Sequence, residues 1–143
     1  MTGVLAVGGE SLAGFTGKAS FVALMKANQI RQQEIHTEML YLIQQSKIDG
    51  SPLNLQKHFR SSLNWNLRWR IRRGTRQDHV LWSNIEVDLA KLPIPVQQHY
   101  ERLNRRAQEL NHLDIMTQHV IRWCNIHLGH QQARNPPGLL ESE

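Results

Sequence analysis

The chain has 143 residues, of which 40% are hydrophobic and 20% charged, and its formal net charge is +5. This length and composition fit one folded domain and exclude a collagen, a disulfide scaffold and a wholly disordered chain. The single cysteine, Cys124, excludes an internal disulfide. A free thiol without a secretory leader predicts a cytoplasmic protein. No window reaches 18 apolar residues, so no membrane partner is expected.

The first half of the chain is predicted to begin with a long helix. Residues 1–16 are expected to form a flexible lead-in, residues 17–132 a single helical domain, and residues 133–143 a disordered tail. Apolar residues recur at three- and four-residue steps from Phe21 to Ile43, which predicts a helix from residues 16–18 to about 47. Asp49-Gly50 and Ser51-Pro52 are turn signals that end it, and a short helix is expected over residues 53–60.

Residues 64–72 change to a period of two. Four apolar residues alternate there with polar ones: Trp65, Leu67, Trp69 and Ile71. On a strand these four side chains share one face and the intervening arginines share the other, whereas a helix would scatter them. A basic ribbon is therefore predicted at about residues 63–82, and the sequence leaves open whether residues 77–83 pair as its second strand.

The remaining elements are predicted to be helical. Leu81, Ile85 and Leu89 favour a short helix near residues 81–91, and Leu92-Pro93-Ile94-Pro95 breaks it. A last helix is expected from about residue 95 to residue 131. The predicted fold class is mainly α, with two long antiparallel helices, a short third helix and a basic β-strand or β-hairpin insertion.

Positive charge is concentrated in one segment. Residues 50–77 contain seven basic side chains and no Asp or Glu. Their charge of +7 exceeds the chain's total of +5, so the other residues sum to −2. Six of the seven are arginines, whose planar guanidinium groups match phosphate in a bidentate fashion.

This pattern predicts a nucleic-acid-binding ribbon. Arg68, Arg70 and Arg72 are expected to contact phosphates or a groove. Arg73 and Arg76 are expected to bind the nucleic acid from the turn. If each of the five neutralises one phosphate, log affinity falls with log salt at a slope of about −4.5. DNA is the expected ligand and RNA remains open. The alternatives are a solvated strand edge and a surface for an acidic protein partner.

Other candidate sites are set aside. Trp65 and Trp69 are interpreted as core residues and not as stacking platforms. The basic group of Arg102, Arg105 and Arg106 is diluted by acidic neighbours and is interpreted mainly as a solvated helix face. The histidines of the last helix lack the converging ligands of a zinc site, and Cys124 falls on an apolar seam. No metal, cofactor or catalytic residue is predicted, so the chain is not expected to be an enzyme.

Three stretches resemble a family of uncharacterised proteins encoded on bacterial integrative and conjugative elements, some of which are labelled "integrase regulator R". The family shows a lead-in similar to residues 12–18 followed by Phe21-Val22-Ala23-Leu24. It shows the motif found here as Leu67-Arg68-Trp69-Arg70, followed by a segment similar to Val80-Leu81-Trp82. The break at Leu92-Pro93 before a long helix also agrees. Residues 71–74 depart from the family, which usually continues with more acidic or neutral residues.

The resemblance implies an accessory protein of a mobile element in a bacterial cytoplasm, and it assigns no site residues. Combined with the basic ribbon, it predicts a DNA-binding accessory or regulator of integration, excision or transfer. An integrase or another mobile-element protein is a second expected partner, and a homodimer remains open. The alternative function is a non-enzymatic helical interaction module whose arginine-rich face binds an acidic protein.

Overall fold

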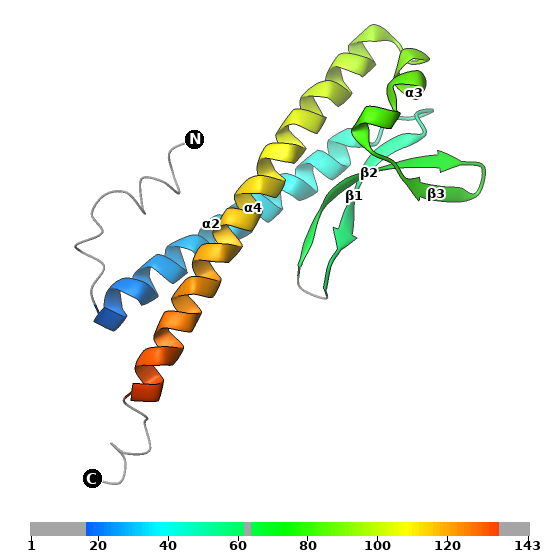
Figure 1. The fold of residues 1–143 in the computed structure, drawn as a ribbon. Coiled ribbons are helices and arrows are strands. Elements are labelled where there is room, and N and C mark those ends of the chain that lie inside the picture. Colours follow the sequence, from blue (N-terminus) through cyan, green and yellow to red (C-terminus); the bar gives the residue numbers. More distant parts are fainter. Residues whose placement is uncertain (1–16, 62–63, 135–143) are drawn as a thin grey trace. The chain divides into compact units, whose positions relative to one another are not determined.

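The structure is a computed structural model that describes residues 17–61 and 64–134, with side chains described to residue 129. The elements are α2 (Gly17–Ser46), β1 (Leu53–Phe59), β2 (Trp65–Arg73), β3 (Arg76–His79), the 3-10 turn η2 (Trp82–Asn84), α3 (Glu86–Ala90) and α4 (Ile94–Arg134) (Figure 1). The chain divides into two compact units. Unit 1 holds the described residues 17–34 and 114–134, and unit 2 holds residues 35–113.

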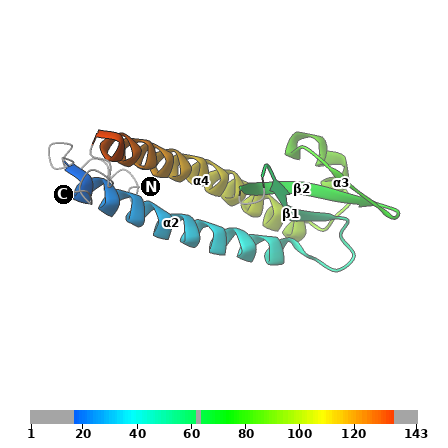
Figure 2. The ribbon, with the colours of Figure 1, turned by 90° about the horizontal axis from the view of Figure 1, so that it is seen from below.

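Unit 2 contains a three-stranded antiparallel sheet in the order β1-β2-β3. Strand β2 is central and pairs with β1 from Phe59↔Trp65 to Leu53↔Ile71 (Figure 2). It pairs with β3 from Arg70↔His79 to Arg73↔Arg76. Two residues connect β2 to β3, and the first, Gly74, has a φ of +65°. A type II′ hairpin turn requires such a positive φ at this position, where glycine carries no steric cost.

One face of the sheet packs against the helical elements of unit 2. The alternation predicted for residues 65–71 is present, because all four apolar side chains of β2 are buried. They join Leu53 and Leu55 of β1 in a core with residues of α2, α3 and α4. Burial of a large side chain contributes roughly 1.5–3 kcal/mol, so this face supplies much of the unit's stability.

Two asparagines of α4 fix the helix to the central strand. The Asn111 side chain accepts a hydrogen bond from the Leu67 amide at 2.9 Å and donates one to the Leu67 carbonyl at 3.0 Å. Asn104 accepts from the Trp69 indole at 2.9 Å. Strand β3 pairs with β2 only from Arg70 onward, so Asn111 takes the place of a neighbouring strand at Leu67. Polar groups of β2 that would otherwise be unpaired are thereby satisfied.

Tyr100 ties the start of α4 to the connection between α2 and β1. The side chain is fully buried, and its hydroxyl lies 2.6 Å from Ser51 Oγ, 3.2 Å from the Ser46 carbonyl and 3.0 Å from the Leu53 carbonyl. Ser46 in turn donates to the Ile43 carbonyl and accepts from the Leu55 amide. Burial raises the pKa of Tyr100, so the hydroxyl stays protonated and remains a donor.

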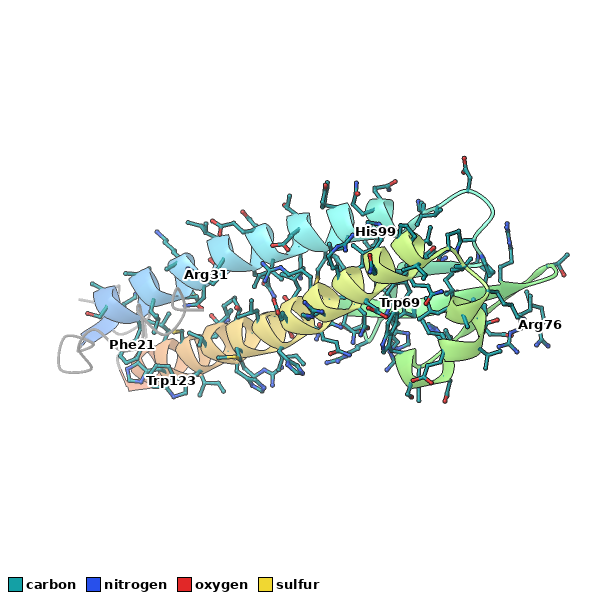
Figure 3. The ribbon with its side chains drawn as sticks, turned by 90° about the horizontal axis from the view of Figure 1, so that it is seen from above. Phe21, Arg31, Trp69, Arg76, His99 and Trp123 are labelled. Atoms are coloured by element: carbon teal, nitrogen blue, oxygen red, sulfur yellow. The ribbon has the colours of Figure 1, made fainter. Side chains whose placement is uncertain are left out.

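Unit 1 brings the first part of α2 together with the last part of α4. The Phe21 ring centroid lies 5.0 Å from that of Trp123 and 3.7 Å from that of His127 (Figure 3). Cys124 and Thr117 are fully buried, and Gln32 and Gln118 donate to the buried carboxylate of Asp114. Asp114 interrupts the apolar seam in the sequence and is satisfied by these amide donors.

The predicted fold class is wrong. Within the described residues the structure has three helices and a three-stranded antiparallel sheet, and not the predicted two long antiparallel helices with a short third helix and a β-strand or β-hairpin insertion. The short helix predicted over residues 53–60 is strand β1. The helix predicted near 81–91 is replaced by the turn η2 and the five-residue α3. Leu81 is the residue before η2, and its backbone is extended, which delays the helix.

The predicted lead-in (1–16) lies outside the described residues, and so does most of the predicted tail, residues 135–143. Strand β2 and the start of α2 agree with the sequence prediction to within about a residue, which is the ordinary uncertainty of such boundaries.

Candidate nucleic-acid interface

Strand β2 places three predicted arginines on the side of the sheet opposite the core. Arg68, Arg70 and Arg72 alternate with buried residues; Arg68 and Arg72 are exposed, and Arg70 is half-buried. Residues two apart on a strand are separated by about 6.6 Å, so the three side chains form a row about 13 Å long from the first to the last. The shared face required by the nucleic-acid hypothesis is therefore present.

The neighbouring strands extend this face with uncharged polar side chains. Register places Asn54 opposite Arg70 and Gln56 opposite Arg68 on β1, and Gln77 opposite Arg72 on β3. We call the set the polar face: Asn54, Gln56, His58, Asn66, Arg68, Arg70, Arg72, Gln77 and His79. None of these nine residues is acidic or apolar. The polar face is thus a continuous surface of donors and acceptors with a charge of +3 when its histidines are neutral.

Two histidines lie together on the polar face. The rings of His58 and His79 are 4.9 Å apart in an edge-to-face arrangement. Arg70 Nη2 lies 3.1 Å from His79 Nε2, and because arginine can only donate, this nitrogen is the acceptor of a neutral ring. Partial desolvation and the adjacent guanidinium groups, chiefly Arg68 for His58 and Arg70 for His79, lower the pKa of both. Desolvation and the positive field of the arginines therefore both favour the neutral form of each ring.

A bridge of two glutamines crosses the centre of the polar face. Gln56 Nε2 donates to Gln77 Oε1 at 2.7 Å, which joins β1 to β3 over the central strand. Beneath it, Arg70 Nε and Asn54 Oδ1 are shielded from solvent and have no hydrogen-bond partner among the described residues. The bridge leaves Gln56 a carbonyl oxygen and Gln77 an amide nitrogen for further hydrogen bonds.

Arg68 and Arg72 are not neutralised by the described part of the chain. No described carboxylate forms an ion pair with either guanidinium group. Arg60 extends the positive charge beyond the end of β1. When the Asn66 amide is oriented so that its nitrogen donates to the His58 carbonyl, its oxygen accepts a hydrogen bond from Arg60 Nη2 at 3.2 Å. A hollow of about 210 Å³ adjoins the other end, where Arg72 and Gln77 line it together with Lys47 and Asp49.

The other two predicted site residues lie at the β2–β3 turn. In the alternation of the strand they belong to the face opposite the polar face. Arg73 and Arg76 are direct cross-strand partners, and both are exposed. By alternation they point to the side of Ile71, although the tip projects beyond the core (Figure 3). Arg76 forms an ion pair with Asp78 at 3.1 Å. The structure thus separates the five predicted arginines into a row of three and a pair at the hairpin tip.

The second basic group of the sequence is partly neutralised. Arg106 binds both carboxylate oxygens of Glu38, with Nη2 at 2.7 Å from Oε1 and Nε paired with Oε2, and it binds Glu109 at 2.9 Å. These hydrogen bonds raise the pKa of Arg106 above its ordinary value. Arg102 and Arg105 are exposed on α4. Because α4 packs on the core side of the sheet, these residues are separate from the polar face.

The remaining candidates of the sequence lack the geometry of a site. No group of three His, Cys, Asp or Glu side chains within residues 17–61 and 64–129 is placed to hold a metal ion. Cys124 is fully buried, and burial raises the pKa of its thiol, which keeps it protonated and unreactive. Trp65 and Trp69 are buried on the core face, with Trp69 against Trp82 and Tyr100.

Sequence reasoning missed the contributions of β1 and β3 to the polar face. In β1, Leu53 and Leu55 alternate with Asn54, Gln56 and His58, which is the same signal as in β2. Lys57 obscures the alternation, because a charged residue stands where an apolar one is expected. Its ammonium nitrogen lies 4.7 Å from the Trp65 ring centroid, and this cation–π contact explains why a lysine is found on that face. In β3 only four residues pair, too few for a periodic signal.

Comparisons with known proteins found no matching family model, no matching curated protein and no matching solved structure. Of the helices in the described residues, none combines the length and the apolar character needed to cross a bilayer.

Proposed function

We propose that the polar face binds nucleic acid. The observation that carries the proposal is the row of Arg68, Arg70 and Arg72 on one face of the sheet, in a surface whose nine residues include no carboxylate. Three like charges at intervals of about 6.6 Å repel one another mildly in water, and a polyanion removes this repulsion while it releases its own counterions.

The lack of carboxylate partners for the three arginines among the described residues supports this proposal. An arginine already held by a carboxylate, as Arg106 is by Glu38, offers little to a phosphate. The hydrogen bond that Arg70 makes within the face goes to a neutral ring and leaves its charge uncompensated. Arg68 and Arg72 are exposed and outside every ion pair of the described residues. Charge-assisted hydrogen bonds to phosphate are therefore open to the exposed Arg68 and Arg72, and the half-buried Arg70 adds an uncompensated positive charge between them.

The test is a salt titration of binding by fluorescence anisotropy, with a labelled 16-base-pair duplex and its single strands. Removing two phosphate contacts by Arg68→Ala with Arg72→Ala should make the slope of log affinity against log salt shallower by about 1.8. The matched control, Arg102→Ala with Arg105→Ala, removes two exposed cations from α4 and should leave the slope unchanged. Equal slopes for the two double variants would contradict the proposal.

The assay also separates nucleic acid from an acidic protein, which is the alternative ligand of an arginine-rich face. Poly-L-glutamate at the same charge concentration serves as the competitor. It should displace the duplex poorly, because a flexible carboxylate chain lacks the fixed phosphate spacing. Displacement as efficient as that by unlabelled duplex would favour an acidic protein partner.

The biological setting follows from the sequence resemblance. We propose that the nucleic acid is DNA and that binding serves the integration, excision or transfer of a mobile element, with an integrase or a related protein as a second partner. A cytoplasmic location and the lack of an enzymatic role belong to the same proposal. The number of copies that bind is measured in the same titration, by comparing the binding stoichiometry with the mass of the free protein.

A further inference from the structure

We infer that the polar face enters the major groove of duplex DNA and contacts base edges there. This inference rests on the proposed function and narrows it to one kind of nucleic acid and one groove. Three observations carry it: the dimensions of the sheet, the lack of Phe, Tyr and Trp on the polar face, and the chemistry of the side chains at its centre.

The dimensions of the sheet match the major groove. Adjacent strands lie about 4.8 Å apart, so the three strands span about 10 Å across the backbone. The major groove of B-DNA is about 12 Å wide, whereas the minor groove is about 6 Å wide and the major groove of an RNA duplex is deep and narrow. Along β2, the row from Arg68 to Arg72 is about 13 Å long, which corresponds to about four base pairs at 3.4 Å each.

Single-stranded nucleic acid fits the polar face poorly. Proteins that bind single strands stack the bases on aromatic side chains, each of which contributes substantially to affinity. The nine residues of the polar face include no Phe, Tyr or Trp. The aromatic residues of β2, Trp65 and Trp69, are buried on the core face. The aromatic rings of the polar face are the imidazoles of His58 and His79, which lie edge-to-face against each other, so a single strand would meet charge without a large Phe, Tyr or Trp platform.

The centre of the polar face has the groups that read base edges. Arginine recognises the O6 and N7 atoms of guanine, and glutamine or asparagine recognises N6 and N7 of adenine. Gln56 and Gln77 hold each other in place across the sheet and keep one donor and one acceptor group for a ligand. Arg70 lies between them, positioned by His79. A fixed set of amides and one guanidinium group is suited to base edges, while the exposed Arg68 and Arg72 flank it.

The experiment compares four probes of one mixed sequence by anisotropy at a fixed salt concentration. They are a DNA duplex, its single strands, the RNA duplex, and a DNA duplex in which 7-deazapurines replace the purines. The last probe keeps the phosphates and the base pairing but lacks the N7 acceptors of the major groove. We expect the DNA duplex to bind most tightly and the 7-deazapurine duplex to bind at least about fivefold more weakly, since one good base contact accounts for such a factor.

Two variants assign the effect to the glutamine bridge. In Gln56→Ala with Gln77→Ala, the ratio between the natural and the 7-deazapurine duplex should fall toward one. Gln44→Ala, an exposed glutamine of α2 in unit 2, is the matched control and should keep the full ratio. Thermal unfolding followed by circular dichroism confirms that both variants fold.

Each other outcome overturns a different statement. Equal binding of the natural and the 7-deazapurine duplex would leave a phosphate-binding face and refute base contacts in the major groove. Tighter binding of the single strands or of the RNA duplex would refute the choice of duplex DNA while the proposed function stands. If none of the four probes binds, both the inference and the proposed function fail.

Discussion

The two faces of strand β2 show how one stretch of nine residues serves two purposes. On the core side, Trp65, Leu67, Trp69 and Ile71 are buried. On the other side, Arg68, Arg70 and Arg72 form the row of the polar face. Substitutions on the first face should act on the free energy of unfolding, and those on the second should act on ligand binding. The comparison teaches that the affinity of the polar face can be changed without a large loss of stability.

The largest effect is expected from Trp69→Ala. The side chain is buried against Trp82 and Tyr100 and donates to Asn104, so truncation removes a large apolar area and leaves a cavity. The free energy of unfolding should fall by about 3–5 kcal/mol, as measured by urea denaturation. The neighbouring Arg68→Ala, one residue away on the polar face, should change it by less than about 0.5 kcal/mol. Similar losses for the two variants would contradict the division of the strand into two faces.

A smaller loss is expected from Asn111→Ala. This change removes both hydrogen bonds to the backbone of Leu67 and leaves a shielded amide and carbonyl without partners. The cost of such unpaired groups is about 1–3 kcal/mol. Gln108→Ala, an exposed position three residues earlier on α4, is the control and should have little effect. If Asn111→Ala is as stable as the control, the amide is not the substitute for a β-strand that we describe.

Arginines on the two sides of the sheet should also differ. Arg106→Ala breaks a bidentate pair with Glu38, and it should destabilise unit 2 by up to about 1 kcal/mol because the pair is partly exposed. Arg72→Ala breaks no ion pair in the described residues and should be neutral for unfolding. The difference should shrink when the urea titration is repeated at 1 M salt, since screening weakens the pair. A difference that does not depend on salt would mean that packing, and not charge, stabilises Arg106.

The two faces of strand β2 could be predicted from the sequence, because they depend on a local pattern. The alternation of residues 65–71 is sufficient to place indoles on one face and guanidinium groups on the other. The first helix is likewise marked by the spacing from Phe21 to Ile43. Both signals are local, because strand and helix periods act over a few residues.

The sheet as a whole depends on contacts between distant residues, and this part could not be predicted. Leu67 has its backbone satisfied by Asn111, which lies 44 residues away, and nothing in the sequence near either residue marks that pairing. Strand β3 is only four residues long and is defined by its register with β2. For the same reason Gln77 and His79 were not recognised as part of the polar face.

The smallest expected effect is a dependence of binding on pH that comes from His58 and His79. The charged and titratable neighbours of His58 are Arg60, Arg68, Arg70 and His79, and those of His79 are Arg68, Arg70 and His58. Desolvation and the neighbouring arginines lower the pKa of both rings in the folded chain, which favours their neutral form. Protonation at lower pH adds positive charge beside the arginine row and should strengthen binding of a polyanion. Each proton taken up contributes at most one log unit of affinity per pH unit.

The same titration should have the opposite sign for folding. The unfolded chain binds protons at the ordinary histidine pKa of 6.5, and the folded chain binds them only below it. The contribution of the two histidines to the free energy of unfolding is therefore fully present above pH 6.5. It is lost as the pH falls from there through the lower pKa values of the folded state. Anisotropy and urea titrations between pH 5 and 8 measure both trends on one sample. His58→Gln with His79→Gln should flatten both, and His112→Gln, an exposed histidine of α4, should flatten neither. Affinity that rises toward low pH as steeply in the double variant as in the natural chain would exclude the histidine pair as its source.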